Sequence, residues 1–147
     1  MDFKTNVRNS VPVTTRMTLE LIDATGAATP LETELNYQPQ DPFAVSATFY
    51  TVAGPVRWTF GRDLLVGGLS EPTGDGDVHV WPCLDNEGAP VVIIELCSPD
   101  GEALVQARTA DMTAFVERMT AAVALGAEEM HLDIDSAIAA IFAAETA

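Results

Sequence analysis

Residues 43–69 read FAVSATFYTVAGPVRWTFGRDLLVGGL, and this stretch decides the class of fold. Apolar and polar side chains alternate through residues 43–51, with the period of two that is typical of a half-buried β-strand. Gly54-Pro55 predicts a tight turn, and residues 56–60 alternate again. Two strands joined by so short a turn pair antiparallel, so the stretch predicts an antiparallel meander.

The following residues, RDLLVGGL, break the alternation and predict a short helical turn that the two glycines end. We expect this turn to act as a clamp on the sheet. Leu64 and Leu65 are predicted to bury against the sheet, while Arg62 or Asp63 pairs with backbone or with a neighbouring charge.

The rest of the chain extends the same pattern in both directions. Further strands are predicted at residues 13–21, 31–37, 78–81, 91–97 and 102–108. A period of 3.6 begins at Thr109 and predicts a helix that ends before Gly126, and a second helix is predicted from Asp133. The sequence therefore predicts an α+β domain: an antiparallel-rich sheet or barrel of about seven strands, a short helical turn and two C-terminal helices. We assign residues 13–147 to this single domain and predict a disordered arm at residues 1–12.

The net charge of −15 is distributed unevenly along the chain. Residues 1–62 carry −1 and residues 63–147 carry −14, and so acidic a surface repels phosphate backbones and anionic lipids. We therefore expect neither nucleic-acid binding nor membrane insertion. The N-terminus has no apolar signal core, so a cytosolic protein with reduced cysteines is expected.

Residues with catalytic chemistry are few. Cys83 and Cys97 are predicted to be small buried side chains, and His79 a solvated or hydrogen-bonded one. His131 follows two glutamates that could raise its pKa or share a metal, but no second histidine or cysteine stands at metal-ligand spacing. A nucleophile–base pair would need a cysteine to meet His79 in an activating environment, and Asp75-Gly76-Asp77 is read as a turn and not as a calcium loop. We predict no enzyme activity, no catalytic or metal-binding residues and no cofactor.

Two features leave alternatives open. Trp58 and Trp81 either pack in the core or anchor a protein partner, since tryptophan is enriched at interface hot spots. The apolar stripe of the predicted last helix, residues 134–142, either completes the core or docks on a neighbouring subunit. The partner-binding surface is left unassigned.

Several motifs follow one another along the chain. They are Tyr37-x-x-x-Asp41-Pro42-Phe43-Ala44-Val45-x-Ala47-Thr48-Phe49, Trp58-x-Phe60-x-Arg62-Asp63-Leu64-Leu65, Pro72-x-Gly74-x-Gly76-Asp77-Val78-x-Val80-Trp81-Pro82 and Ser98-Pro99-x-Gly101-x-Ala103-Leu104, followed by Phe115 and Arg118-x-Thr120. In this order, these sequence blocks resemble the SsgA-like proteins of actinobacteria. The blocks span nearly the whole chain, although residues 1–12 match none of them.

This resemblance implies a non-catalytic regulator that controls where septa form in sporulating actinomycetes. The family member that the chain resembles most recruits the tubulin-like division protein FtsZ, promotes its polymerisation and is itself placed at septa by an SsgA-type paralogue. The resemblance also implies a homotrimer and a fold similar to the Whirly single-stranded-DNA-binding proteins. A single-stranded nucleic-acid binder is therefore the alternative, although Whirly proteins hold DNA with a lysine-bearing strand motif, and the single lysine of this chain, Lys4, lies outside every block.

Overall fold

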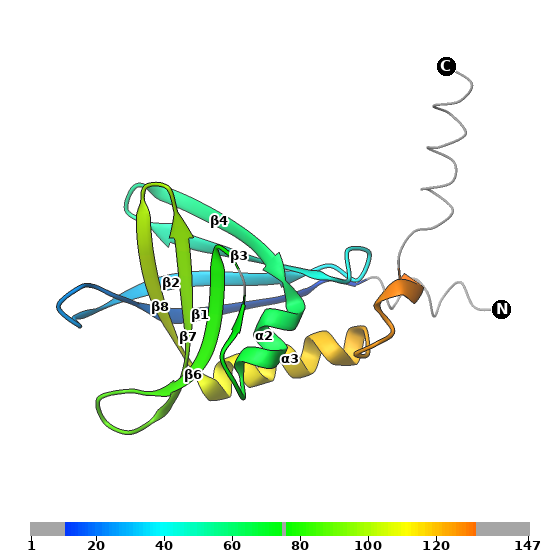
Figure 1. Cartoon of the computed structure of the whole chain (residues 1–147). Helices are drawn as coiled ribbons and strands as arrows, with labels where there is room; N and C mark the ends of the chain where they lie inside the picture. Colours follow the sequence, from blue (N-terminus) through cyan, green and yellow to red (C-terminus); the bar gives the residue numbers. More distant parts are fainter. Residues whose placement is uncertain (1–10, 75, 132–147) are drawn as a thin grey trace, which may run out of the picture.

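The computed structural model describes residues 11–74 and 76–131, which form one eight-stranded antiparallel sheet with two helices on its inner face (Figure 1). The order across the sheet is β4-β3-β2-β1-β8-β7-β6-β5. The strands are β1 (Val13–Ile22), β2 (Ala28–Tyr37), β3 (Ala44–Thr51), β4 (Gly54–Gly61), β5 (Thr73–Gly74), β6 (Val78–Leu84), β7 (Pro90–Ser98) and β8 (Gly101–Arg108). The helices are α2 (Arg62–Gly68) and α3 (Thr109–Ala122), and a 3-10 turn, η1 (Glu128–His131), follows α3.

The sheet consists of two four-strand meanders, each followed by a helix. Strands β1 to β4 lead into α2, and β5 to β8 lead into α3. The meanders join where β1 meets β8 over three residue pairs, Glu20 to Ile22 against Gln106 to Leu104, whereas β1 and β2 pair over their full length. Because the two halves touch over so short a ladder, they diverge and the sheet bends into a half-barrel around the helices (Figure 1).

The core lies inside this bend and follows the alternation of the sequence. The inward-facing side chains of β1 to β3 include Leu19, Leu35 and Val45, which are almost fully buried. Val80, Ile94 and Val105 face the same core from the second meander, and α3 adds Met112, Phe115 and Met119. The period of two thus places one continuous apolar surface on the inner face of the sheet.

The predicted α+β class and antiparallel pairing are confirmed, with one strand more than expected. The extra strand, β5, is a two-residue edge strand that directly precedes Asp75-Gly76-Asp77, the stretch read from the sequence as a turn. This strand could not be predicted from the sequence, because two residues are too few to show an alternation of apolar and polar side chains. It is defined only by its pairing with Val80 and His79 of β6. The predicted helix from Thr109 is confirmed, whereas the helix predicted from Asp133 and most of the predicted arm lie outside the described residues.

The predicted clamp is confirmed, and its glycines have an additional function. A Cβ on Gly68 would lie 2.2 Å from Val80 Cγ1, and one on Gly67 would lie 2.7 Å from Thr73 Oγ1. Only glycines let α2 approach β5 and β6 this closely. Leu65 is fully buried beneath the helix, and Leu64 is half buried against the same core.

Arg62, the first residue of α2, is fully buried and connects elements that are distant in sequence. Its Nη1 donates to the carbonyl of Val123 at 2.8 Å and to the hydroxyl of Tyr37 at 3.2 Å. Its Nη2 donates to the carbonyl of Ala124 at 3.1 Å and to Glu128 Oε2 at 2.7 Å, and Nε donates to the same oxygen at 3.1 Å. The guanidinium therefore satisfies the carbonyls that follow the C-terminal end of α3, and its charge is paired with a carboxylate, as a buried charge requires.

Truncating Leu65 to alanine is expected to lower the free energy of unfolding by about 2–5 kcal/mol, because the substitution leaves a cavity under α2. Urea denaturation measures this loss, and Leu64→Ala is the matched control, with a smaller loss because Leu64 is half exposed. A loss below about 0.5 kcal/mol for Leu65→Ala would mean that the side chain is accessible to solvent.

The Arg62–Glu128 pair predicts a specific dependence of stability on pH. Hydrogen bonds from Arg62 hold the pKa of Glu128 below its ordinary value of 4.5. Because the pKa is lower in the folded state, the pair adds stability above pH 4.5, and this contribution disappears as the pH falls through the folded-state pKa. The wild type should therefore be more stable than Glu128→Gln at pH 7, and the difference should shrink in acid. Glu129→Gln, at an exposed neighbouring position, should have the same free energy of unfolding as the wild type. A stability difference between the wild type and Glu128→Gln that stays constant with pH would contradict this prediction.

Candidate partner-binding surface

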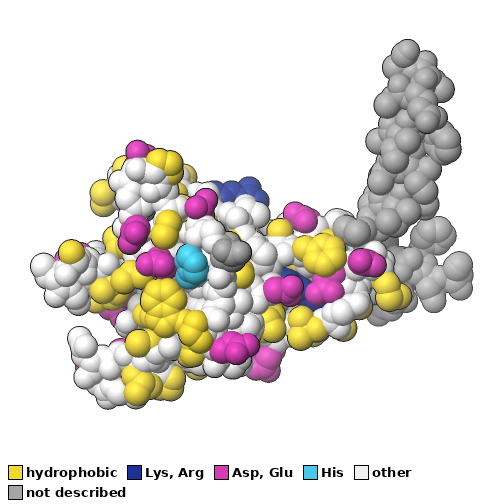
Figure 2. All heavy atoms as spheres, in the orientation of Figure 1, with side chains coloured by type: hydrophobic (Ala, Val, Ile, Leu, Met, Phe, Trp, Pro, Cys, Tyr) yellow, Lys and Arg dark blue, Asp and Glu magenta, His cyan; other side chains and the backbone are white. Residues whose placement is uncertain are grey.

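The outer face of β6 and β7 carries apolar side chains that the inner core does not use. Strand pairing places Trp81 beside Ile93 and Cys83 beside Val91 on this face. Ile93 and Val91 are buried, although neither belongs to the core cluster, so neighbouring side chains on the outer face cover them. Figure 2 shows apolar side chains gathered in this region beside a histidine and several acidic side chains. Strand β7 is thus covered on its outer face at Val91 and Ile93 as well as on its inner face.

A groove of about 940 Å³ runs along the outer face between two hairpin tips. One wall is the β1–β2 turn, the other is the β6–β7 turn, and Gln106 and Arg108 of β8 lie between them. Both tips extend away from the helices (Figure 1). Leu84 lines the groove at the end of β6, and its side chain is 65% exposed.

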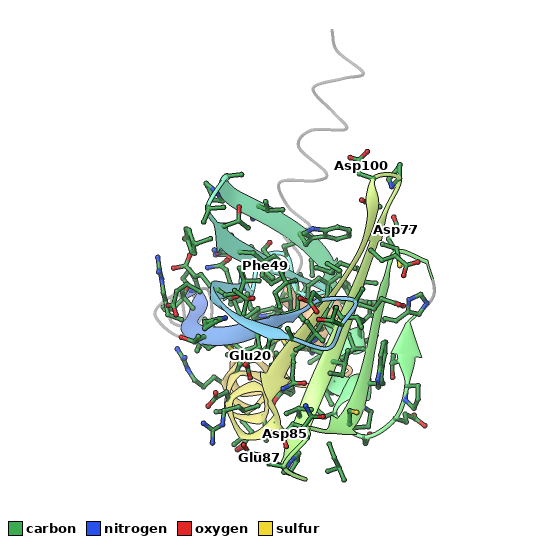
Figure 3. All side chains as sticks on the ribbon, turned by 90° about the vertical axis from the view of Figure 1, so that its left-hand side faces the viewer. Glu20, Phe49, Asp77, Asp85, Glu87 and Asp100 are labelled. Atoms are coloured by element: carbon green, nitrogen blue, oxygen red, sulfur yellow. The ribbon has the colours of Figure 1, made fainter. Side chains whose placement is uncertain are left out.

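The lining of the groove combines this apolar side chain with negative charge. Glu20, Asp85 and Glu87 line it together with Arg108. In Figure 3, Glu20 lies over the middle of the sheet, and Asp85 and Glu87 lie near the β6–β7 tip. Such a groove suits a partner segment that presents apolar side chains flanked by basic ones.

The two walls of the groove are turns of the same type, and both have the sequence Asp-x-x-Gly-Ala. Asp23 Oδ1 accepts hydrogen bonds from the backbone N–H groups of Thr25 at 2.8 Å and Ala27 at 3.0 Å. Asp85 Oδ1 accepts in the same way from Glu87 and Ala89, both at 2.8 Å. In each turn the glycine, Gly26 or Gly88, has a positive φ that favours glycine.

Hydrogen bonds in the first of these turns also lower the pKa of Asp23, the side-chain bond from Thr25 being the largest cause. Neither the shared motif of the two turns nor the groove between them was predicted from the sequence. The repeated Asp-x-x-Gly-Ala spacing was the signal that could have identified the matched walls.

The structure brings together three chemically reactive side chains, of which His79 and Cys97 were already candidates from the sequence. His79 pairs directly with Glu95 across β6 and β7, and Cys97 lies two residues further along the same face of β7. The ligand atoms of the three side chains lie within 4.8 Å of one another. Glu95 could not be recognised as part of this group from the sequence, because only the strand register places it beside His79.

The environment of Cys97 does not activate its thiol as a nucleophile. Burial raises the pKa of Cys97, and the nearby carboxylates of Glu95, Glu102 and Asp77 raise it further. A raised pKa keeps the thiol protonated at neutral pH, whereas nucleophilic cysteines have a lowered pKa. Although Cys97 and His79 lie close together, the raised pKa of the thiol argues against a catalytic pair.

The prediction of buried cysteines was wrong for Cys83 and only partly right for Cys97. Cys83 is exposed, because the last three residues of β6 extend beyond the core toward the hairpin tip, and Cys97 is half buried. The two tryptophans also differ. Trp58 packs against the core cluster, whereas Trp81 lies half buried on the outer face.

The remaining candidates lie apart from this surface. His131 ends η1, and among residues 11–74 and 76–131 it joins no group of metal-ligating side chains. Asp77 accepts a backbone hydrogen bond from Cys97 at 2.8 Å, while Asp75 lies outside the described residues.

Exposed apolar side chains also occur elsewhere in the described residues, the most exposed being Val52 in the β3–β4 turn. None of the helices in the described part of the chain has the length and apolar character needed to span a bilayer.

Comparisons with known proteins agree with the sequence blocks. Residues 31–128 match the family described as Streptomyces sporulation and cell division protein, SsgA. The chain is 43% identical over 132 residues to the sporulation-specific cell division protein SsgB of Streptomyces coelicolor, covering 89% of this chain and 96% of that protein. It is 40% identical to the SsgB of Frankia casuarinae over 128 residues, covering 86% of this chain and 89% of that protein.

Solved structures extend the similarity to the fold. The crystal structure of an SsgA-like sporulation-specific cell division protein from Thermobifida fusca YX-ER1 superposes with a TM-score of 0.80 at 37% identity, covering 89% of this chain and 96% of that one. A structure reported with SsgB mutations that correlate to longitudinal cell division during sporulation of Streptomyces coelicolor gives a TM-score of 0.78 at 42% identity, covering 83% and 96%. On the family match, the sequence identity and the shared fold together, the chain belongs to the SsgA-like family of sporulation and cell division proteins.

Proposed function

We propose that this protein is a non-catalytic regulator that selects septum sites during sporulation, by binding FtsZ at division septa in the cytoplasm and promoting its polymerisation. The observation that carries the proposal is the similarity to SsgB proteins, which extends over 89% of the chain in the Streptomyces coelicolor comparison. An SsgA-type paralogue that places the protein at the septum is the second proposed partner, on the same family resemblance.

The chemistry of the described residues supports a binding function more than a catalytic one. The thiol of Cys97 has a raised pKa, and the buried Arg62–Glu128 pair serves the packing of α3. By contrast, the outer face offers an exposed leucine, a half-buried tryptophan and a groove between two hydrogen-bonded turns, and such a surface suits a protein partner. We therefore propose that FtsZ binds in the groove beside Leu84.

Three arginines of the described residues have partners within the protein, which argues against the nucleic-acid alternative. Arg62 is buried in its ion pair, and Arg118 donates to the hydroxyl of Thr15 at 2.5 Å. Arg16 lies 3.8 Å from Glu34 and stacks over the ring of Tyr50 at 4.5 Å. Arginines that are already engaged, on a chain with a net charge of −15, offer little to a phosphate backbone. Likeness to the Whirly fold stays a prediction and adds no nucleic-acid site.

A homotrimer is the proposed assembly, and the sheet edges give it a physical basis. Strand β5 is a two-residue edge, whereas β4 leaves eight residues at the other edge, with Pro55 near its start. Val56 on β4 is 43% exposed. A closed ring of identical contacts would cover such an edge without forming a filament.

FtsZ binding should depend on Leu84. A Leu84→Asp substitution places a charge in the groove, and we expect it to weaken FtsZ binding roughly tenfold or more and to abolish the promotion of FtsZ polymerisation. Biolayer interferometry measures the affinity, and light scattering follows polymerisation.

Val52→Asp is the matched control, because Val52 is also exposed but lies in the β3–β4 turn, away from the groove. Binding that survives Leu84→Asp and is lost in Val52→Asp would move the interface to that turn. No binding by the wild type would contradict the function itself. Saturable binding of labelled single-stranded oligonucleotides at low salt would favour the alternative.

The trimer should become slightly stronger as salt rises. Three chains at −15 each carry −45, so repulsion opposes assembly and screening relieves it. Multi-angle light scattering at low and moderate salt measures the mass. A mass near 15.6 kDa at every concentration would contradict the trimer, and dissociation at higher salt would mean that ion pairs hold the ring together.

A further inference from the structure

We propose that His79, Glu95 and Cys97 form a zinc-binding site on the outer face of β6 and β7, separate from the groove beside Leu84. The three side chains supply an imidazole nitrogen, a carboxylate oxygen and a sulfur. Zn²⁺ accepts all three donor types, whereas Mg²⁺ and Ca²⁺ require oxygen ligands, so the donor set favours zinc.

The backbone already holds these side chains near the geometry that zinc needs. Their ligand atoms lie within 4.8 Å of one another. In a tetrahedral site with bond lengths of about 2.0–2.3 Å, ligand atoms are roughly 3.3–3.8 Å apart, a difference that side-chain rotation can cover. The register fixes the arrangement, because His79 and Glu95 are paired residues, and Cys97 donates its N–H to the carbonyl of Asp77 at 2.8 Å.

A second observation concerns the ring nitrogen of His79. Its Nδ1 is buried and accepts or donates no hydrogen bond within the described part of the chain, although it lies 3.4 Å from Glu95 Oε1. Buried polar atoms without a partner are rare, and a bound ion is one recognised explanation for them. A zinc ion between Nδ1, the carboxylate and the thiolate would satisfy this atom.

The local charge also favours a cation. Glu95, Glu102 and Asp77 all lie close enough to Cys97 to disfavour its thiolate. A divalent cation would compensate this negative charge and stabilise the thiolate, which is the form that binds metal. With three protein ligands, one coordination position stays open to water or to a donor from another molecule.

The test is isothermal titration of Zn²⁺ into the full, reduced chain after removal of metal by a chelator. We expect one Zn²⁺ per chain, with an affinity that falls about tenfold or more in His79→Gln and in Cys97→Ser. Cys83→Ser and His131→Gln are matched controls, because each removes the other residue of its type and leaves the proposed ligands intact. Both controls should bind like the wild type.

Two further measurements separate loss of the site from loss of the fold. Co²⁺ should give thiolate-to-metal charge-transfer absorption in the wild type and in Cys83→Ser but not in Cys97→Ser. Without metal, the melting temperature should be similar in all variants, because the side chains of the proposed ligands lie on the outer face. Zn²⁺ should raise the melting temperature only of those proteins in which all three proposed ligands are present.

The absence of saturable Zn²⁺ binding would overturn the proposal and leave His79 and Glu95 as a simple ion pair. Zinc binding that is unchanged in both His79→Gln and Cys97→Ser would overturn it as well. Neither result bears on FtsZ binding, because the proposed FtsZ surface is tested by variants of Leu84 and Val52.

Discussion

The structure depends on one buried guanidinium. Arg62 stands where the first meander ends and α2 begins, and it donates to the carbonyls of Val123 and Ala124, just past the end of α3. Its hydrogen bonds also reach Tyr37 of β2 and Glu128 of η1. A buried arginine is tolerated only when its donors and its charge are satisfied, so the position of α3 and η1 is fixed relative to the first half of the sheet.

This constraint complements the short ladder between the two meanders. Only three residue pairs join β1 to β8, so the main-chain bonds at the seam are few. The helices supply the remaining connection, since α2 follows the first meander but packs on β5 and β6, while α3 follows the second and contacts β1. Gly67 and Gly68 make the first of these contacts possible, because a Cβ at either position would collide with Thr73 or Val80. The half-barrel is thus held by helices that cross from one half to the other.

With the inner face closed in this way, the chemistry available to partners lies on the outer face. The same β6–β7 register that buries Val80 and Ile94 inside places Trp81 and Ile93 outside. Leu84 and the two Asp-x-x-Gly-Ala turns continue this face as a groove. The second half of the chain, which forms most of this face, is strongly acidic. This charge favours partners that present apolar and basic groups and disfavours nucleic acids.

Local pattern was sufficient for the elements and for the inner face. A period of two assigns alternate residues to one face whatever the strand pairs with, so residues such as Leu19, Leu35 and Val45 could be read as core from the sequence. The clamp at residues 62–69 was also readable, because two adjacent leucines between an arginine and two glycines break the alternation. The family, too, followed from ordered blocks of sequence, and the comparisons confirmed it.

Strand order and register could only come from the tertiary structure. Arg62 meets Glu128 across 66 residues, and His79 meets Glu95 because β6 and β7 pair in one register out of many. The exposure of Cys83 depends on how far β6 extends past the core, and the groove depends on two turns from different meanders lying opposite each other. These contacts gain their free energy only when distant segments come together, so no local preference in the sequence reports them.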